Sequence, residues 1–200
     1  MKKILTVTYV TIGFVILLIL IGCGLFILYW STPFLLPSSK REPPIILSNL
    51  LLTSDYFPSG WKADGFPEPE PEQFELDWGE ENLFIGFQPT GYEGYATHYI
   101  YKFRNKAAAK YGLLMIKQQG LLTPYSSETP IGWSYRSPIA NDWLFGCIDS
   151  KGCTALARYD EFISVFRTNT DSKYMTSDDL ETILKAIDKK MNRYLELNPR

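Results

Sequence analysis

The sequence has one histidine, three cysteines and almost no net charge, and each scarcity excludes a class of function. Twenty Lys and Arg residues stand against 22 Asp and Glu residues, which gives a formal charge of -2. A nucleic-acid-binding protein needs a basic surface, so we expect no nucleic-acid partner. His98 is the only histidine and the cysteines form no C-x2-C pair, so no usual set of metal ligands is present in the sequence.

The sequence signatures of catalysis are also missing. There is no G-x-S-x-G motif, no glycine-rich phosphate loop and no conspicuous pair of carboxylates. The acidic tract from Glu68 to Glu81 lacks the D-x-D-x-D-G spacing of a calcium loop, so we interpret it as a solvated loop. For His98 we expect a surface or half-buried position in a strand. We therefore predict that the protein is not an enzyme and uses no cofactor.

The average composition hides two different parts of the chain. A hydrophobic share of 46% and a charged share of 21% exclude disorder, collagen and coiled coil as descriptions of the whole chain. The mean hydropathy of -0.10 is that of a soluble protein. However, no residue from Ile4 to Trp30 is charged. The remainder has the composition of one ordinary polar domain of roughly 150 residues, and it contains no internal repeat.

The uncharged segment 4–30 predicts one transmembrane helix. A helix of this length is about 40 Å long, whereas the hydrocarbon core of a bilayer is about 30 Å thick. Tyr29 and Trp30 end the segment, where aromatic rings favour the headgroup region. Lys2 and Lys3 precede it, so the positive-inside rule places residues 1–3 in the cytoplasm. We expect the rest of the chain to lie outside the cytoplasm of a cell of bacterial type.

Two alternatives to a retained helix involve processing of the N-terminus. A cleaved signal peptide needs a shorter apolar run and an A-x-A site, which the sequence does not have. Residues 20–23 resemble a bacterial lipobox, with Cys23 as the lipidated residue. The apolar residues 24–28 stand where a lipoprotein would have a polar spacer. We therefore favour the retained helix and keep lipidation at Cys23 as the alternative.

The remaining residues predict a spacer and one domain. Residues 31–44 contain four prolines and are expected to hold the domain away from the membrane. Residues 45–198 are expected to form an extracytoplasmic α+β domain, an antiparallel sheet with packed helices. Hydrophobic periodicity predicts strands over 83–87, 92–103, 142–148, 153–159 and 161–167, and helices over 106–119 and 177–195.

Side-chain spacing also predicts how the two helices begin and pack. In the first helix, capped by Asn105, the alanines with Tyr111, Leu114 and Met115 are expected to form the buried stripe. In the second helix, Thr176 and Asp179 resemble a capping box. Its predicted apolar face consists of Leu180, Ile183, Leu184, Ile187, Met191 and Tyr194.

Cys147 and Cys153 flank the connection between two predicted strands. In a hairpin their Cα atoms can approach the roughly 5.5–6 Å that a disulfide needs. The expected location outside the cytoplasm is where such bonds persist. We predict a structural disulfide, with free thiols or a metal or redox pair as the alternatives.

Aromatic residues make up 15% of the chain, which is a high share. Trp61, Trp133 and Trp143 are candidates for an aromatic ligand groove, because aromatic concave sites bind carbohydrates, peptides or lipids. The same residues suit the half-buried surface of a sheet core. The sequence leaves both interpretations open.

The C-terminal half carries a paired-cysteine hairpin, Ala157-Arg158-Tyr159 before a strand, and a terminal helix with a regular apolar face. In these features, and in Pro58-Ser59-Gly60-Trp61 leading into a strand, it resembles PsbP-like α/β sandwich domains and extracytoplasmic sensor domains of some bacterial serine/threonine kinases. The resemblance covers roughly residues 50–195. It implies a module that binds a ligand or partner without chemistry of its own. No kinase domain is present, so phosphorylation is not implied.

Together these features predict a single-pass membrane protein that presents a binding or sensory domain outside the cytoplasm. The expected partners are the membrane, through residues 4–30, and a protein or small-molecule ligand that the sequence does not identify. A structural or accessory subunit of a membrane or envelope complex is the first alternative. An unrecognised hydrolase is the second.

Overall fold

The computed structural model describes residues 14–28, 46–69, 81–118, 133–148, 152–169 and 174–197. Contacts divide the chain into two units, Met1–Pro37 and Ser38–Arg200, and each is considered by itself. The first unit contains a helix over residues 14–28. The second contains all the strands and the remaining described helices.

The helix over residues 14–28 exposes its large apolar side chains. Leu20 is 63% exposed and Ile27 is 65% exposed, and the other large apolar residues of this helix are similar. Within the described ranges, no helix combines the length and the apolar character needed to cross a membrane. The predicted span 4–30 extends beyond this helix at both ends, and residues 4–13 and 29–30 lie outside the described residues, as do the predicted stub 1–3 and spacer 31–44.

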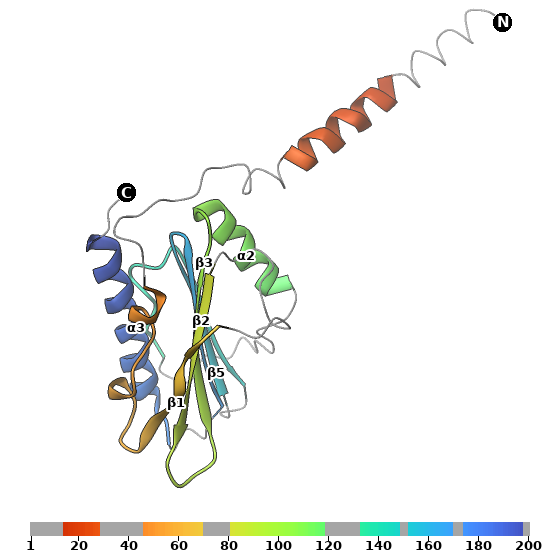
Figure 1. Ribbon diagram of the computed structural model, residues 1–200. Coiled ribbons are helices and arrows are strands. Elements are labelled where there is room, and N and C mark those ends of the chain that lie inside the picture. Colours follow the sequence, from red (N-terminus) through yellow and green to blue (C-terminus); the bar gives the residue numbers. More distant parts are fainter. Residues whose placement is uncertain are drawn as a thin grey trace, which may run out of the picture. The chain divides into compact units, whose positions relative to one another are not determined.

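The second unit is built on a six-stranded antiparallel sheet, drawn in Figure 1. The strands lie in the order β1-β2-β3-β6-β5-β4, so each half of the sheet is a run of neighbouring hairpin-type pairs. The α+β class expected from the sequence is confirmed. The strand bounds are β1 Trp61–Glu68, β2 Glu81–Pro89, β3 Tyr95–Lys102, β4 Asp142–Ile148, β5 Gly152–Tyr159 and β6 Phe162–Asn169.

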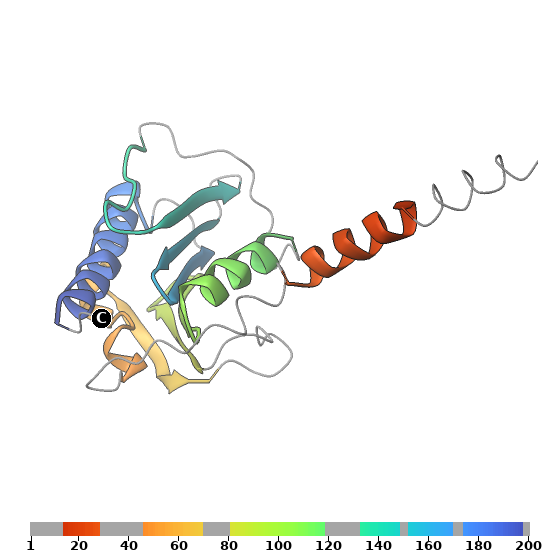
Figure 2. The same ribbon diagram turned by 90° about the horizontal axis from the view of Figure 1, so that it is seen from above.

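Two long helices cover opposite faces of this sheet. Figures 1 and 2 show α3 (Ser177–Leu197) on one side and α2 (Lys106–Gln118) on the other. Two short 3-10 helices, η1 (Leu47–Asn49) and η2 (Ser54–Tyr56), precede β1. This three-layer arrangement follows from strands that are apolar on both faces, because each face then needs its own cover.

The larger core lies between the sheet and α3. It also takes in the η1 and η2 segment, whose apolar side chains pack against strand residues of the same face. The predicted apolar face of α3 is confirmed, with only Tyr194 partly buried. The main buried residues of this larger core are Leu51, Phe57, Phe87, Ile100, Tyr159, Phe166, Ile183, Leu184 and Met191.

Both long helices begin as the sequence predicts. The Asn105 side-chain oxygen accepts a hydrogen bond from the Ala108 N–H at 2.9 Å, which caps α2. At α3, the Thr176 N–H donates to the Asp179 carboxylate at 2.8 Å and the Asp179 N–H donates to the Thr176 hydroxyl at 3.2 Å. These reciprocal bonds form a capping box.

The smaller core lies between the sheet and α2, and it corrects the predicted stripe of that helix. Leu113 and Ile116 are buried, whereas Leu114 is 44% exposed. The face is selected by Gly112, because a Cβ built there would lie 2.5 Å from the ring of Phe103. The helix therefore places the Gly112 backbone against the fully buried Phe103 ring. A glycine gives no signal in a hydrophobic periodicity, so the sequence pattern missed this register.

Gly112 provides a test of this packing. Gly112→Ala should lower the free energy of unfolding by about 1–2 kcal/mol, because overpacking of a core outweighs the gain of about 1 kcal/mol in helix propensity. Urea unfolding of the full-length chain, followed by tryptophan fluorescence, measures the change. In a Phe103→Leu background the same substitution should be neutral or stabilising. An equal loss in both backgrounds would contradict the contact.

Candidate functional site

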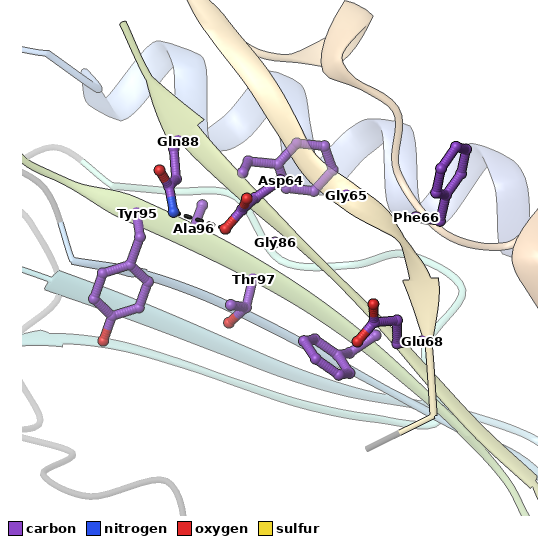
Figure 3. Close-up of a pocket in the computed structure, with 11 residues that line it drawn as sticks. Asp64, Gly65, Phe66, Glu68, Gly86, Gln88, Tyr95, Ala96 and Thr97 are labelled. Atoms are coloured by element: carbon purple, nitrogen blue, oxygen red, sulfur yellow. Dashed lines mark hydrogen bonds between the residues drawn. The ribbon is translucent and has the colours of Figure 1, made fainter. Parts of the chain in front are cut away.

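A pocket of about 490 Å³ lies over β1, β2 and β3 (Figure 3). Among the β2 and β3 residues that line it, Phe84, Gly86, Gln88, Tyr95 and Thr97 share the alternation of Tyr99 and Tyr101, which pack toward α2. Phe87 and Ala96 belong to the core on the α3 side of the sheet. The pocket therefore occupies a part of the α2-bearing face that α2 does not cover. The residues that line it are Asp64, Gly65, Phe66, Glu68, Phe84, Gly86, Phe87, Gln88, Tyr95, Ala96 and Thr97.

A bulge in the edge strand β1 forms one wall. Asp64 pairs with Gly86 and Glu68 with Phe84, so residues 65–67 face a single residue of β2. Gly65 makes this possible because its φ of +85° is a conformation that side chains disfavour. The interpretation of the acidic tract as a loop is therefore wrong at its two ends, because Glu68 belongs to β1 and Glu81 belongs to β2. Pairing of Glu68 with β2 continues the strand through the bulge.

Gly86 forms the floor of the pocket. It stands between Asp64 on β1 and Thr97 on β3 in the register of the sheet. A Cβ there would lie 3.5 Å from the Asp64 Cβ, which is ordinary contact, so the pocket space is open above the backbone. Phe84 borders this space and stacks on Tyr99 with ring centroids 5.3 Å apart.

The polar groups of the pocket are only partly satisfied. Gln88 Nε2 donates to Asp64 Oδ2 at 2.7 Å, and Figure 3 shows the two side chains directed toward each other. The Thr97 hydroxyl oxygen is buried and has no hydrogen-bond partner within the described part of the chain. Such a group normally finds a partner in water or a ligand.

The two carboxylates of the pocket differ from others on the sheet. The carboxylates of Glu81, Asp142 and Asp160 each pair with a Lys or Arg, at 3.2, 2.6 and 2.6 Å respectively. Among the residues that the structure describes, neither Asp64 nor Glu68 has such a partner. The pocket therefore carries two carboxylates with which no described Lys or Arg forms an ion pair.

The three tryptophans predicted as a groove lie at different places. Trp61 is 4% exposed and packs against Phe57, with ring centroids 5.4 Å apart, on the β1 edge. Trp133 stacks on Phe145 at 4.2 Å, and Trp143 meets Tyr135 edge-on at 5.8 Å, on the opposite, β4 edge. The structure thus brings Trp133 and Trp143 into one aromatic cluster but not Trp61. None of the three lines the pocket.

The cysteines are placed as follows. Cys147 and Cys153 face each other across the β4–β5 pair and form a disulfide, with Cα atoms 4.0 Å apart. The predicted disulfide is confirmed. Cys23 is a free, exposed cysteine in the helix over residues 14–28, and its lipidation stays a prediction.

His98 is fully buried, which corrects the expectation of a surface or half-buried histidine. Its Nδ1 accepts a hydrogen bond from the Leu52 N–H at 3.1 Å, so the proton is on Nε2, which donates to Ser164 Oγ at 3.0 Å. Burial, with a smaller effect from Lys190, lowers its pKa to about 3. The chain at Leu52, between η1 and η2, covers His98, and strand alternation alone could not show that cover.

A second buried polar cluster had no expected role. Asp188 lies on the apolar face of α3 and accepts hydrogen bonds from the hydroxyls of Tyr135, Ser137 at 2.7 Å and Tyr159 at 2.5 Å. Burial and then the nearby Asp188 raise the pKa of Tyr159 well above its usual range. The signal in the sequence was an acid four residues after Leu184, within the apolar stripe. The cluster ties α3 to β5 and to residues 135–137.

Comparisons of the chain with protein-family models, with curated proteins and with solved structures found no match. The resemblance to PsbP-like domains therefore stays a prediction. The assignment of function rests on the geometry of the pocket and of the buried polar groups.

The disulfide should stabilise the domain by about 2 kcal/mol, because it restricts a short loop in the unfolded chain. Replacement of both Cys147 and Cys153 by Ser should lower the free energy of urea unfolding by that amount. Cys23→Ser is the matched control and should change nothing. Equal stability of all three proteins would contradict a stabilising bond.

His98 should make stability depend on pH. Its folded pKa of about 3 is below the unfolded value of 6.5, so its contribution is complete above pH 6.5 and is lost as pH falls toward 3. His98→Gln retains an acceptor and a donor but does not titrate. The difference in unfolding free energy between wild type and variant should fall by up to about 1.4 kcal/mol per pH unit in this window. A difference independent of pH would contradict a neutral, buried His98.

Proposed function

We propose that this protein is a membrane-anchored, extracytoplasmic binding or sensory module without catalytic activity, and that the pocket over β1, β2 and β3 is its recognition site. The observation that carries the proposal is this pocket of about 490 Å³, which combines an open glycine floor with two carboxylates that have no cationic partner among the described residues. A volume of this size suits a small molecule or one side chain of a partner.

The position of the pocket supports binding by a preformed surface. Gly86 and Thr97 lie within regular strands whose pairing continues on both sides. Strands hold side chains more precisely than loops do, so little conformational freedom is lost when a ligand enters. The Asp64–Gln88 hydrogen bond further fixes two of the polar side chains.

The contacts of the residues with strongly shifted pKa values support a role without catalysis. Both ring nitrogens of His98 have partners inside the core. Tyr135 and Tyr159 donate to Asp188, and burial with this contact raises both pKa values. Catalytic groups with shifted pKa values are usually found in clefts, whereas these connect elements of the fold. Their role is structural.

The membrane anchor is supported by the first unit and by the sequence before it. The helix over residues 14–28 exposes large apolar side chains that water would not favour. Lys2 and Lys3 favour a cytoplasmic N-terminus. Lipidation of Cys23 is the alternative means of attachment. The proposed resemblance to PsbP-like domains and to extracytoplasmic sensor domains of bacterial kinases agrees with a domain presented in this way.

A role as an accessory subunit is the second candidate, and one observation favours it. Phe66 is 86% exposed at the tip of the β1 bulge, and Figure 3 shows it apart from the side chains around Thr97. An exposed aromatic side chain of this kind is typical of protein contact sites. In this case Phe66, which also lines the pocket, would contact a partner protein.

A plugged pocket tests the proposed recognition site. Gly86→Leu should place a side chain in the pocket, since a Cβ at this position makes only ordinary contact. A library of small-molecule fragments is screened against full-length wild type and variant by the amide NMR shifts of residues Gly65 and Thr97. We expect fragments that bind wild type and bind the variant at least tenfold more weakly.

The controls separate loss of the pocket from loss of the fold. The midpoint of urea unfolding of Gly86→Leu should remain close to that of wild type. If Gly86→Leu is destabilised, Thr97→Leu serves as a second variant that fills the pocket. Fragments that bind both plugged variants as well as wild type, or a library that yields no pocket ligand, would contradict the proposed site.

A further inference from the structure

We propose that the pocket recognises an organic cation, an ammonium group on an apolar stem that carries one positive charge. This inference rests on the proposed function, because it names the ligand chemistry of the same site. A free alkylamine and a lysine side chain of a peptide share this chemistry.

The unpaired carboxylates determine the sign of the ligand's charge. Asp64 and Glu68 lie at the two ends of the β1 bulge, and both line the pocket. Within the described residues they have no cationic partner, whereas Glu81, on the neighbouring strand β2, pairs with Lys102 at 3.2 Å. An ammonium group between them gains two favourable interactions, and an anion would meet two repulsions.

The aromatic side chains match the stem and the charge. Phe84 and Tyr95 line the pocket on either side of the row that contains Gly86 and Thr97. Aromatic faces attract cations and also pack against methylene groups. Tyr95 is 48% exposed, so its ring is accessible to a ligand. Thr97 lines the pocket between the positions of these two rings.

The neighbouring positive charges limit the ligand to a single charge. Lys62 pairs in register with Gln88, and Arg167 pairs with Thr97, both on the strands that border the pocket. Neither side chain lines the pocket itself. A second positive charge on the ligand would approach one of them and be repelled. A monocation is therefore favoured over a polyamine.

The experiment compares probes that differ in charge at nearly constant shape. The probes are Nα-acetyl-lysine amide, its uncharged isostere Nα-acetyl-norleucine amide, n-pentylammonium, spermidine and glucose. Each is titrated into the full-length protein in detergent micelles, and the amide NMR shifts of Gly65, Gly86 and Thr97 report binding. We expect the lysine derivative to bind at least fivefold more tightly than the norleucine derivative. Spermidine, despite its additional charges, should bind no more tightly than n-pentylammonium.

Isosteric variants test the carboxylates. Asp64→Asn with Glu68→Gln should weaken binding of the lysine derivative at least fivefold and leave the norleucine derivative unchanged. Asp55→Asn, an exposed carboxylate outside the pocket, is the matched control and should have no effect. Tight binding of n-pentylammonium would identify a free amine as the source of the cation, and tighter binding of the lysine derivative would identify a peptide side chain.

Other outcomes overturn the inference and leave the proposed function distinguishable. Equal binding of the lysine and norleucine derivatives, or preferential binding of glucose, would show recognition by shape or hydroxyl groups and refute the cation. No binding of any probe would also refute it. In both cases the proposed site stands if Gly86→Leu abolishes binding of fragments from the library. If no fragment depends on Gly86, the proposed function fails as well.

Discussion

The pairing of β3 with β6 is the interaction on which the rest of the structure depends. It joins two runs of strands that are far apart in the sequence, and eight residue pairs align along it. Both cores meet at this seam, since Ile100 and Phe166 face α3 while Tyr101 and Ile163 face α2. His98 and Ser164 are hydrogen-bonded near its centre. A slip of one residue would exchange the two faces and place His98 under α2.

Strand and helix positions were predictable because their signals are local. Alternation located β3, β4, β5 and β6 closely, and caps located the starts of both long helices. Contacts between distant segments were not predictable in this way. Gly112 allows α2 to pack closely on Phe103 because it has no side chain. His98 is covered by Leu52, which lies 46 residues earlier in the sequence. The pocket depends on the β1 bulge, which the sequence did not predict.

The described tryptophans serve the core, one of the two uses that the sequence left open. Trp61 belongs to the α3-facing core, and Trp133 and Trp143 pack against it near β4. The candidate site is instead built from small and charged residues, with Phe84 and Tyr95 beside them. The two pocket carboxylates could not be recognised as a pair in the sequence, because Glu68 begins a tract that was interpreted as a solvated loop and Asp64 lies before that tract. Only the register of β1 against β2 separates Asp64 and Glu68 from the rest.

The β1 bulge also affects how the domain meets other copies of itself. An edge strand normally presents a continuous row of N–H and C=O groups to which another strand can add. On β1 the regular row ends after Asp64, and Pro67 contributes no N–H. This edge is therefore a poor template for ordered aggregation. The irregularity that forms one wall of the pocket is therefore also one that interrupts strand addition at this edge.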